Sequence, residues 1–129
     1  MKIFFDTNVL ISAFIVNGAC YEVVHDSINQ HELYYTDFII GEFKKVFKDD
    51  FHFSEGVIKE CTVFIEKFFM KGNTASEIKN VCKDKDDNQL LADAVLNNID
   101  VIVTGDKEVL DLKTYRSIHI ISPAEYWRL

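Results

Sequence analysis

The sequence predicts an α/β fold: a three-layer α/β/α sandwich whose central, mainly parallel sheet has four to five strands. Short apolar runs alternate with amphipathic helical stretches along the chain, the order typical of strands connected by crossover helices. The runs lack a polar face, as expected for strands covered on both sides. The composition is 48% hydrophobic and 27% charged, that of a globular protein, and 129 residues suit a single domain spanning 1–129.

The first half of the chain contains two of the expected strands and four of the expected helices. In order, the pattern predicts a strand over 3–5, helices over 9–16 and 21–29, a strand over 33–35 and a helix over 37–48. Thr36 or Asp37 is suited to cap the last of these helices. A longer helix follows Ser54, carries a continuous apolar stripe and stops at Gly72.

The second half begins with a stretch, 73–85, that has no strong period, although 78–82 is apolar enough for a short strand. The elements expected after it are an amphipathic helix over 86–98, a strand over 101–103, a helical turn ending at Leu110 and a strand over 119–121. Ser122 and Pro123 then supply a cap and a first-turn proline for a terminal helix.

The net charge and the cysteines indicate which cellular compartment and which binding partners to expect. The net charge is −7, so the overall field repels nucleic acid. If the ligand is a nucleic acid, a bound metal or a partner protein must supply positive charge locally. The three cysteines have no metal-ligand spacing and are expected to be free thiols in a reducing compartment. No apolar run approaches a membrane span. We therefore expect a cytoplasmic protein without a membrane partner.

Four carboxylates fall where such a fold gathers its ligands. Asp6 directly follows the first strand, Asp106 follows the strand over 101–103, Glu42 lies in the second turn of a helix and Asp87 starts another. Parallel strands all end at one edge of the sheet, and ligands bind outside that edge. We therefore expect these four side chains to lie close together.

Helical geometry refines the position of Asp87. At about 100° per residue, Asp87 shares a face with the apolar Leu91 and Ala94. Asp86 and Asp93 share a different face without apolar neighbours, and we expect both to point to solvent.

Converging carboxylates require a cation or raised pKa values, because several buried negative charges repel one another. Oxygen ligands without a Cys or His cluster suit Mg²⁺ or Mn²⁺. A cation of this kind activates water and stabilises charge on a phosphoryl group. The residues therefore predict a metal site made of Asp6, Glu42, Asp87 and Asp106, which would also be the catalytic residues.

Each acid also has a simpler interpretation. Asp6 could cap the following helix, Glu42 could be solvated, Asp87 could favour the positive end of its helix, and Asp106 could form a turn. The joint arrangement is harder to explain in this way than any single member of it.

Weaker candidates surround these acids. Four polar residues could orient a carboxylate or a bound water, namely Thr7, Asn8, Ser12 and Thr104. Lysines near the acids are candidates for RNA phosphate contacts, namely Lys44, Lys45 and Lys107, although Lys44, Lys45 and Lys48 more often form a solvated helix face.

Five segments together resemble the PIN-domain family, in particular its bacterial and archaeal toxin-like (VapC-like) branch. They are IFFDTNVLISA (3–13), TDFIIGE (36–42), DKDDNQLLADA (84–94), VIVTGDKEVL (101–110) and ISPAEY (121–126). The segments occur in the family's order and their span covers nearly the whole chain.

The resemblance implies a PIN-like fold with an acidic Mg²⁺/Mn²⁺ pocket and an endoribonuclease that hydrolyses RNA phosphodiester bonds. It also implies the toxin of a toxin–antitoxin pair, an antitoxin that blocks the site, and a homodimer. Asp6, Glu42, Asp87 and Asp106 match the family's metal-binding acids. Glu108 stands where a second late Asp is often found, and its membership of the site stays open.

Two other functions compete with this one. A signalling receiver domain also uses an acidic Mg²⁺ pocket, but it needs a phospho-accepting Asp at a central strand end, whereas Asp49 and Asp50 follow a helix. A catalytically silent PIN-like module would only bind RNA or protein. Against it, a module without metal chemistry gains nothing from clustered negative charge.

Overall fold

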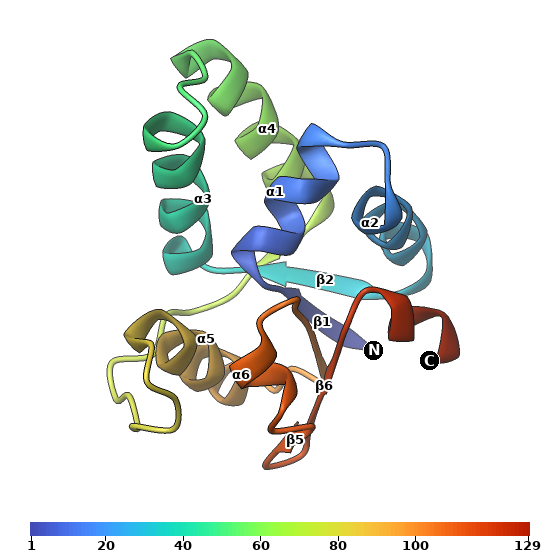
Figure 1. Cartoon of the computed structure of the whole chain (residues 1–129), viewed down its shortest axis with the longest axis vertical. Helices are drawn as coiled ribbons and strands as arrows, with labels where there is room; N and C mark the ends of the chain where they lie inside the picture. Colours follow the sequence, from blue (N-terminus) through green and yellow to red (C-terminus); the bar gives the residue numbers. More distant parts are fainter.

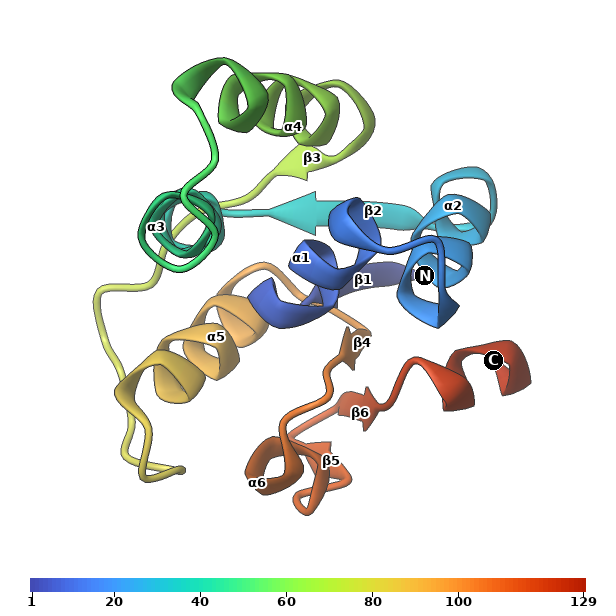
Figure 2. The same ribbon diagram turned by 45° about the horizontal axis from the view of Figure 1, so that its top comes forward.

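The computed structural model describes residues 1–129 and contains a six-stranded sheet between two layers of helices (Figures 1 and 2). The strand order is β3-β2-β1-β4-β6-β5, and only the β5–β6 pair is antiparallel. The strands are β1 (Lys2–Phe5), β2 (Glu32–Tyr35), β3 (Met70–Lys71), β4 (Val101–Val103), β5 (Thr114–Tyr115) and β6 (Ile118–Ile121). The predicted α/β/α sandwich with a mainly parallel sheet is confirmed.

Six α-helices and a terminal 3₁₀-helix connect and cover the strands. They are α1 (Thr7–Ile15), α2 (Ala19–Gln30), α3 (Asp37–Asp49), α4 (Glu55–Phe68), α5 (Lys85–Leu96), α6 (Lys107–Leu110) and η1 (Ala124–Arg128). The Thr36 hydroxyl accepts from the Ile39 amide and caps α3, and Ser54 caps α4 in the same way. No single helix is long and apolar enough to cross a membrane; α1 and α2 together meet that criterion, with a 104° bend between them.

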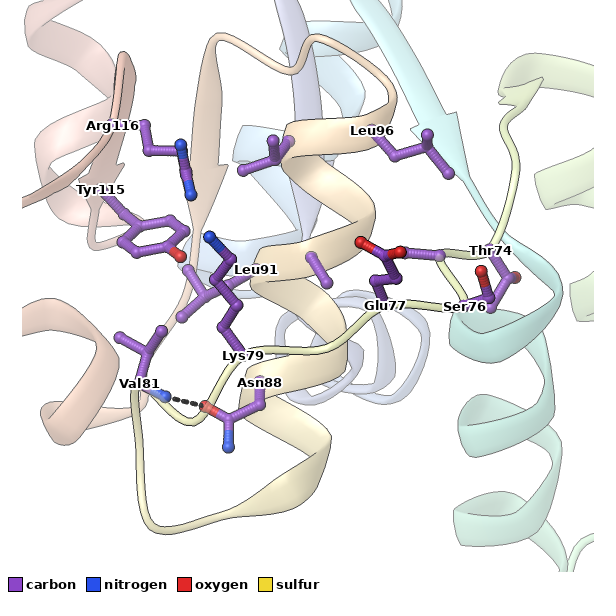
Figure 3. A pocket seen from close by; sticks show the side chains of 13 residues that line it. Thr74, Ser76, Glu77, Lys79, Val81, Asn88, Leu91, Leu96, Tyr115 and Arg116 are labelled. Carbon is purple, nitrogen blue, oxygen red and sulfur yellow. Dashed lines mark hydrogen bonds between the residues drawn. The ribbon is translucent and has the colours of Figure 1, made fainter.

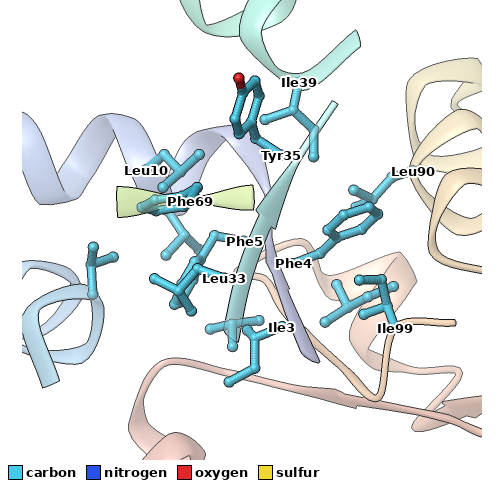
Figure 4. Close-up of a cluster of buried hydrophobic side chains, with 14 of the residues drawn as sticks. Ile3, Phe4, Phe5, Leu10, Leu33, Tyr35, Ile39, Phe69, Leu90 and Ile99 are labelled. Atoms are coloured by element: carbon cyan, nitrogen blue, oxygen red, sulfur yellow. The ribbon is translucent and has the colours of Figure 1, made fainter. Parts of the chain in front are cut away.

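The core lies on both faces of the central strand β1. Phe4 and Phe5 are both fully buried and point to opposite sides, because successive side chains alternate across a strand (Figure 4). Phe4 points towards Leu90 of α5, and Phe5 points towards Leu10 of α1. The uninterrupted apolar sequence of β1 thus reflects helices packed on both faces of the sheet.

The sheet has six strands rather than four or five, because β3 and β5 have only two residues each and carry no sequence period of their own. The possible strand over 78–82 is absent. Residues 72–84 instead form an irregular loop along α5, which we call the α5 loop. Polar side chains of α5 satisfy its backbone groups where a neighbouring strand would otherwise do so.

The chain reverses its direction of travel across the sheet between β1 and β4. From β1 it adds β2 and then β3 on one side, and it later returns to place β4 on the other side of β1. Loops that leave two such strands diverge and open a crevice at their carboxyl ends. Asp6 follows β1 and Thr104 follows β4, so both residues lie at this switch point.

Candidate metal centre

A small cavity of about 120 Å³ opens at the switch point and gathers the four predicted acids. Its lining comprises Asp6, Thr7, Asn8, Phe38, Glu42, Val46, Asp84, Asp86, Asp87, Leu90 and Asp106. The side chains come from the ends of β1 and β4 and from α1, α3 and the first turn of α5. We call this cavity the acidic pocket; six of its side chains are carboxylates, and none is basic.

Asp6 occupies the N-cap position of α1, yet its carboxylate makes no capping hydrogen bond. Instead Oδ2 accepts a 2.7 Å hydrogen bond from the hydroxyl of the fully buried Thr104. Burial raises the pKa of Asp6, and the Thr104 hydrogen bond opposes that shift. The capping interpretation of Asp6 is therefore wrong: its side chain is held towards the pocket from the neighbouring strand.

Asp106 combines a capping role with a position on the pocket. Its Oδ1 accepts from the backbone amides of Glu108 and Val109 at 2.9 and 3.3 Å and caps α6, while its own amide donates to Thr104 Oγ1 at 3.0 Å. The turn interpretation is thus correct for Oδ1. Both amide contacts use that one oxygen, so Oδ2 accepts no backbone hydrogen bond, and the Asp106 carboxyl interacts with that of Asp87 in the pocket.

Asp87 is the most buried acid of the pocket, at 7% exposure. Burial raises its pKa to about 7, with further upward contributions from the negative charges of Asp106 and Asp6. Asp86, one residue earlier, is exposed, as its helix face predicted. Glu42 on α3 is half-buried; burial and the charge of Asp86 raise its pKa.

The donor set fits a divalent cation bound through oxygen. The only ion pair in the structure joins Lys71 to Asp37, so no basic side chain neutralises the acidic pocket. Burial, together with the charge of neighbouring carboxylates, raises the pKa values of Asp6, Glu42 and Asp87. Hard carboxylate oxygens without a nearby His match Mg²⁺ or Mn²⁺ in chemistry.

The predicted polar neighbours separate into two groups. Thr7 and Asn8 line the acidic pocket, and Thr104 lies beneath Asp6. Ser12 is one helical turn beyond Asn8 and does not line the pocket; its hydroxyl contacts the Cys20 thiol. Ser12 is therefore too far along α1 to orient the acids, whereas Thr7, Asn8 and Thr104 lie beside them.

The predicted lysines differ in their position relative to the acidic pocket. Lys45 lies close enough to Glu42 to oppose the rise in its pKa. Lys107 is exposed and directly follows Asp106. Lys44 instead lines a separate groove of about 460 Å³ between α3 and α4, together with Lys48 and Lys59.

Sequence reasoning missed two acids that line the acidic pocket and misplaced a third acid. Asp84 caps α5 through a 2.8 Å hydrogen bond from the Asp86 amide, and both residues line the pocket. The D-K-D-D run was the available signal. Asp93, expected in solvent, is fully buried. It accepts from Ala75 N at 2.6 Å and Gln89 Nε2 at 2.8 Å, because the α5 loop covers its face of the helix.

A second cavity, of about 350 Å³, lies under the α5 loop (Figure 3). Leu91, Val95 and Leu96 of α5 supply much of its apolar wall, whereas the acidic pocket uses Asp87 and Leu90. Lys79 and Arg116 lie at its rim beside Tyr115. It is therefore a separate, mainly apolar hollow on another face of the same helix.

Fold and pocket together define an α/β/α domain whose carboxylates gather at the switch point of a parallel sheet. The family model described as PIN domain matches residues 2–108, a range that includes all four predicted acids. The chain belongs to the PIN domain family.

One solved structure shares this fold over almost its whole length. It is the crystal structure of VapBC2 from Rickettsia felis bound to a DNA fragment from their promoter. A chain of that structure has a TM-score of 0.70 and 12% sequence identity, with 95% of this chain and 98% of that chain covered. No curated protein sequence matches the chain.

Proposed function

We propose that the protein is a Mg²⁺- or Mn²⁺-dependent endoribonuclease that hydrolyses RNA phosphodiester bonds. Proteins of the PIN family are generally nucleases. The observation that carries the proposal is the convergence of Asp6, Glu42, Asp87 and Asp106 on one pocket without a basic side chain. Such a pocket favours a divalent cation, and a cation there reverses the local charge that would otherwise repel a phosphate.

Asp6, Glu42, Asp87 and Asp106 would hold the cation. When bound, it would stabilise negative charge on the phosphoryl group and lower the pKa of an attacking water. Thr104 fixes the direction of the Asp6 carboxylate through its hydrogen bond. Asp106 is held by the first turn of α6 through one of its carboxylate oxygens. These fixed positions reduce the reorganisation that binding requires.

Positively charged side chains beside the pocket would bind the RNA backbone. Lys45 approaches Glu42, and Lys107 adjoins Asp106, so both lie next to the acids. Lys44, Lys48 and Lys59 line the groove between α3 and α4 together with Glu55 and Glu66, and these lysines would extend the contact. In a chain of net charge −7, such local charge would position RNA that the overall field repels.

We further propose that the protein is the toxin of a toxin–antitoxin pair, is blocked by an antitoxin, forms a homodimer and acts in the cytoplasm. Its fold is similar to that of a chain in the structure of VapBC2 bound to a DNA fragment from their promoter. Co-purification from cells that express the neighbouring open reading frame tests the antitoxin. Light scattering of the purified chain tests the dimer.

The decisive experiment for the nuclease is RNA cleavage by the wild type and by Asp6→Asn and Asp87→Asn, with Mn²⁺ or with a chelator. Both substitutions remove a metal-binding charge while keeping the side-chain shape, so cleavage should be lost and circular dichroism unchanged. Asp49→Asn, on the exposed end of α3, is the matched control and should cleave normally. Equal cleavage by both pocket variants and the wild type would refute the mechanism.

A silent binding module is the alternative that this experiment also addresses. A functional metal site predicts that Mn²⁺ raises the melting temperature by mass action, and that Asp87→Asn removes most of this rise. A receiver domain has no support here, because Asp49 ends α3 and Asp50 is its C-cap rather than a strand-end acceptor.

A further inference from the structure

The cavity under the α5 loop exists because the loop is attached to α5 near its two ends and not between them. Near one end Oδ1 of Asp93 accepts from Ala75 N at 2.6 Å, and near the other Oδ1 of Asn88 accepts from Val81 N at 3.0 Å. Residues 76–80 lie between these anchors, are exposed, and have no hydrogen-bond partner for their backbone groups in the chain. The loop therefore arches over the helix and leaves a hollow of about 350 Å³ beneath it (Figure 3).

The wall that α5 gives to this cavity is apolar and partly open to water. Leu91 is buried, whereas Val95 and Leu96 in the same wall are 38% and 50% exposed. Large aliphatic side chains exposed side by side mark a binding surface, unlike scattered single ones. Small-molecule sites are mainly apolar hollows of roughly 300–1,000 Å³. The cavity is thus suited to the apolar body of a small ligand.

Three polar side chains gather at one end of the cavity. Figure 3 shows the Lys79 ammonium, the Arg116 guanidinium and the Tyr115 hydroxyl directed towards the same space. The Arg116 guanidinium lies 5.7 Å from the centroid of the Tyr115 ring, and neither cation forms an ion pair. Two cations that converge without a counter-ion repel each other, so an anion between them is favoured.

The acidic side chain of the lining, Glu77, lies apart from these cations. Figure 3 places Glu77 beside Thr74, away from Lys79 and Arg116. Glu77 repels an anion at its own end of the cavity, and the two cations attract one at the other end. This distribution of charge orients a singly charged anionic ligand, with its head beside Tyr115 and its apolar body along α5.

Arg116 occupies a backbone position that does not favour an arginine. It is the first residue of the two-residue turn between β5 and β6, in which Tyr115 pairs with Ile118, and its φ is 54°. Glycine, asparagine or aspartate usually stands at such a hairpin position, because a longer side chain is strained there. The turn alone gives no reason for an arginine, whereas a carboxylate bound in the cavity does.

We propose that this cavity binds a small amphipathic carboxylic acid, whose apolar body covers Leu91, Val95 and Leu96 and whose carboxylate lies between Lys79 and Arg116. The guanidinium donates to both carboxylate oxygens, and the ammonium adds a charge-assisted hydrogen bond. The cavity shares no lining residue with the acidic pocket, so the inference does not depend on the proposed nuclease.

Titration of the full chain with octanoate, followed by heteronuclear NMR, tests the proposal. Octanoate should shift the amide signals of residues 74–81 and 91–96 and saturate them. Octanamide has the same apolar body without the charge, and acetate has the charge without that body. Each should bind about tenfold more weakly or worse, because each loses one of the two contributions to binding.

Arg116→Gly separates binding from folding. Glycine suits the positive φ, so the melting temperature should not fall, yet the affinity for octanoate should drop about tenfold or more. Lys79→Gln, on the exposed loop, should weaken binding in the same direction. Ala92→Phe places a ring in the cavity, keeps both cations and should abolish binding. The matched control is Arg128→Gln, on the exposed part of η1 outside the cavity, which should bind as the wild type does.

Several results would overturn the proposal. Equal affinities for octanoate and octanamide, or wild-type affinity in Arg116→Gly, would remove the carboxylate from its place between the cations. Absence of any saturable shift would remove the site itself. If the same amide signals shift instead when the chain is diluted, a second copy covers the cavity. If they shift with a short single-stranded RNA and not with octanoate, the cations belong to an RNA contact.

Discussion

The hydroxyl of Thr104 donates a 2.7 Å hydrogen bond to Oδ2 of Asp6, across 98 positions of sequence. The contact joins the carboxyl ends of β1 and β4, the two strands at the switch point of the sheet. The same hydroxyl oxygen accepts from the amide of Asp106. One buried side chain thereby sets the relative positions of two acids of the metal centre.

Thr104→Val should weaken the metal centre more than the fold. Valine keeps the shape but leaves Asp6 without its donor, so we expect unfolding to become easier by about 1–2 kcal/mol. Affinity for Mn²⁺ should fall roughly tenfold, as for other residues that orient a ligand. Calorimetric titration measures this, with the exposed Thr114→Val as control. Recovery of affinity in Thr104→Ser would assign the effect to the hydroxyl; unchanged affinity in Thr104→Val would contradict it.

Without divalent cations the protein should lose stability as the pH rises from about 4 to about 7. The pKa of Asp87 is about 7 in the folded chain against 3.8 ordinarily, so the folded state holds more protons across this window. The free energy of unfolding is highest below the ordinary pKa and declines as the carboxyl ionises. Urea denaturation with a chelator should show a smaller decline in Asp87→Asn. An identical pH dependence in the two proteins would contradict a raised pKa of Asp87.

Asp93→Ala should be among the most destabilising single changes. The fully buried carboxylate accepts from Ala75 N, Gln89 Nε2 and the Thr36 hydroxyl, and its removal leaves these donors unpaired. We expect a loss of about 3 kcal/mol, measured by urea denaturation. Asp49→Ala, at an exposed position, should stay within about 0.5 kcal/mol of the wild type. Similar losses in the two variants would show that the Asp93 network contributes little.

Two glycines should respond oppositely to alanine. A Cβ on Gly72 would lie 2.7 Å from Oδ1 of Asn97, which is held in place by hydrogen bonds to Asn73. Gly72→Ala should therefore destabilise the protein by about 1–3 kcal/mol. A Cβ on Gly41, in α3, meets nothing within 4 Å, so Gly41→Ala should stabilise by about 0.5–1 kcal/mol. Thermal melts compare the two, and a tolerated Gly72→Ala would show that the Asn97 side chain can move.

Much of the fold could be predicted from the sequence because its signals are local. Apolar runs marked the four longer strands, and Thr36 and Ser54 marked the helix starts that they cap. The two-residue strands β3 and β5 could not be predicted, since a pair of residues shows no period and their pairing depends on neighbouring strands.

The convergence of Asp6, Glu42, Asp87 and Asp106 on one pocket followed from their positions at strand ends and helix starts. Their roles as metal ligands and catalytic residues stay predictions, to be tested by the substitutions above. The position of Ser12 outside the pocket could not be predicted, because one helical turn from Asn8 is enough to leave a cavity this small.

By itself, the sequence determined which residues alternate as strands and helices and which carboxylates stand at the edge where parallel strands end. Tertiary structure alone decided the burial of Asp93 and the approach of Cys82 to Asp87. Both depend on the α5 loop, which lies along α5 because polar side chains of that helix bind its backbone. Periodicity reports which face of a helix is apolar, but the identity of the segment covering a polar face depends on contacts between distant residues.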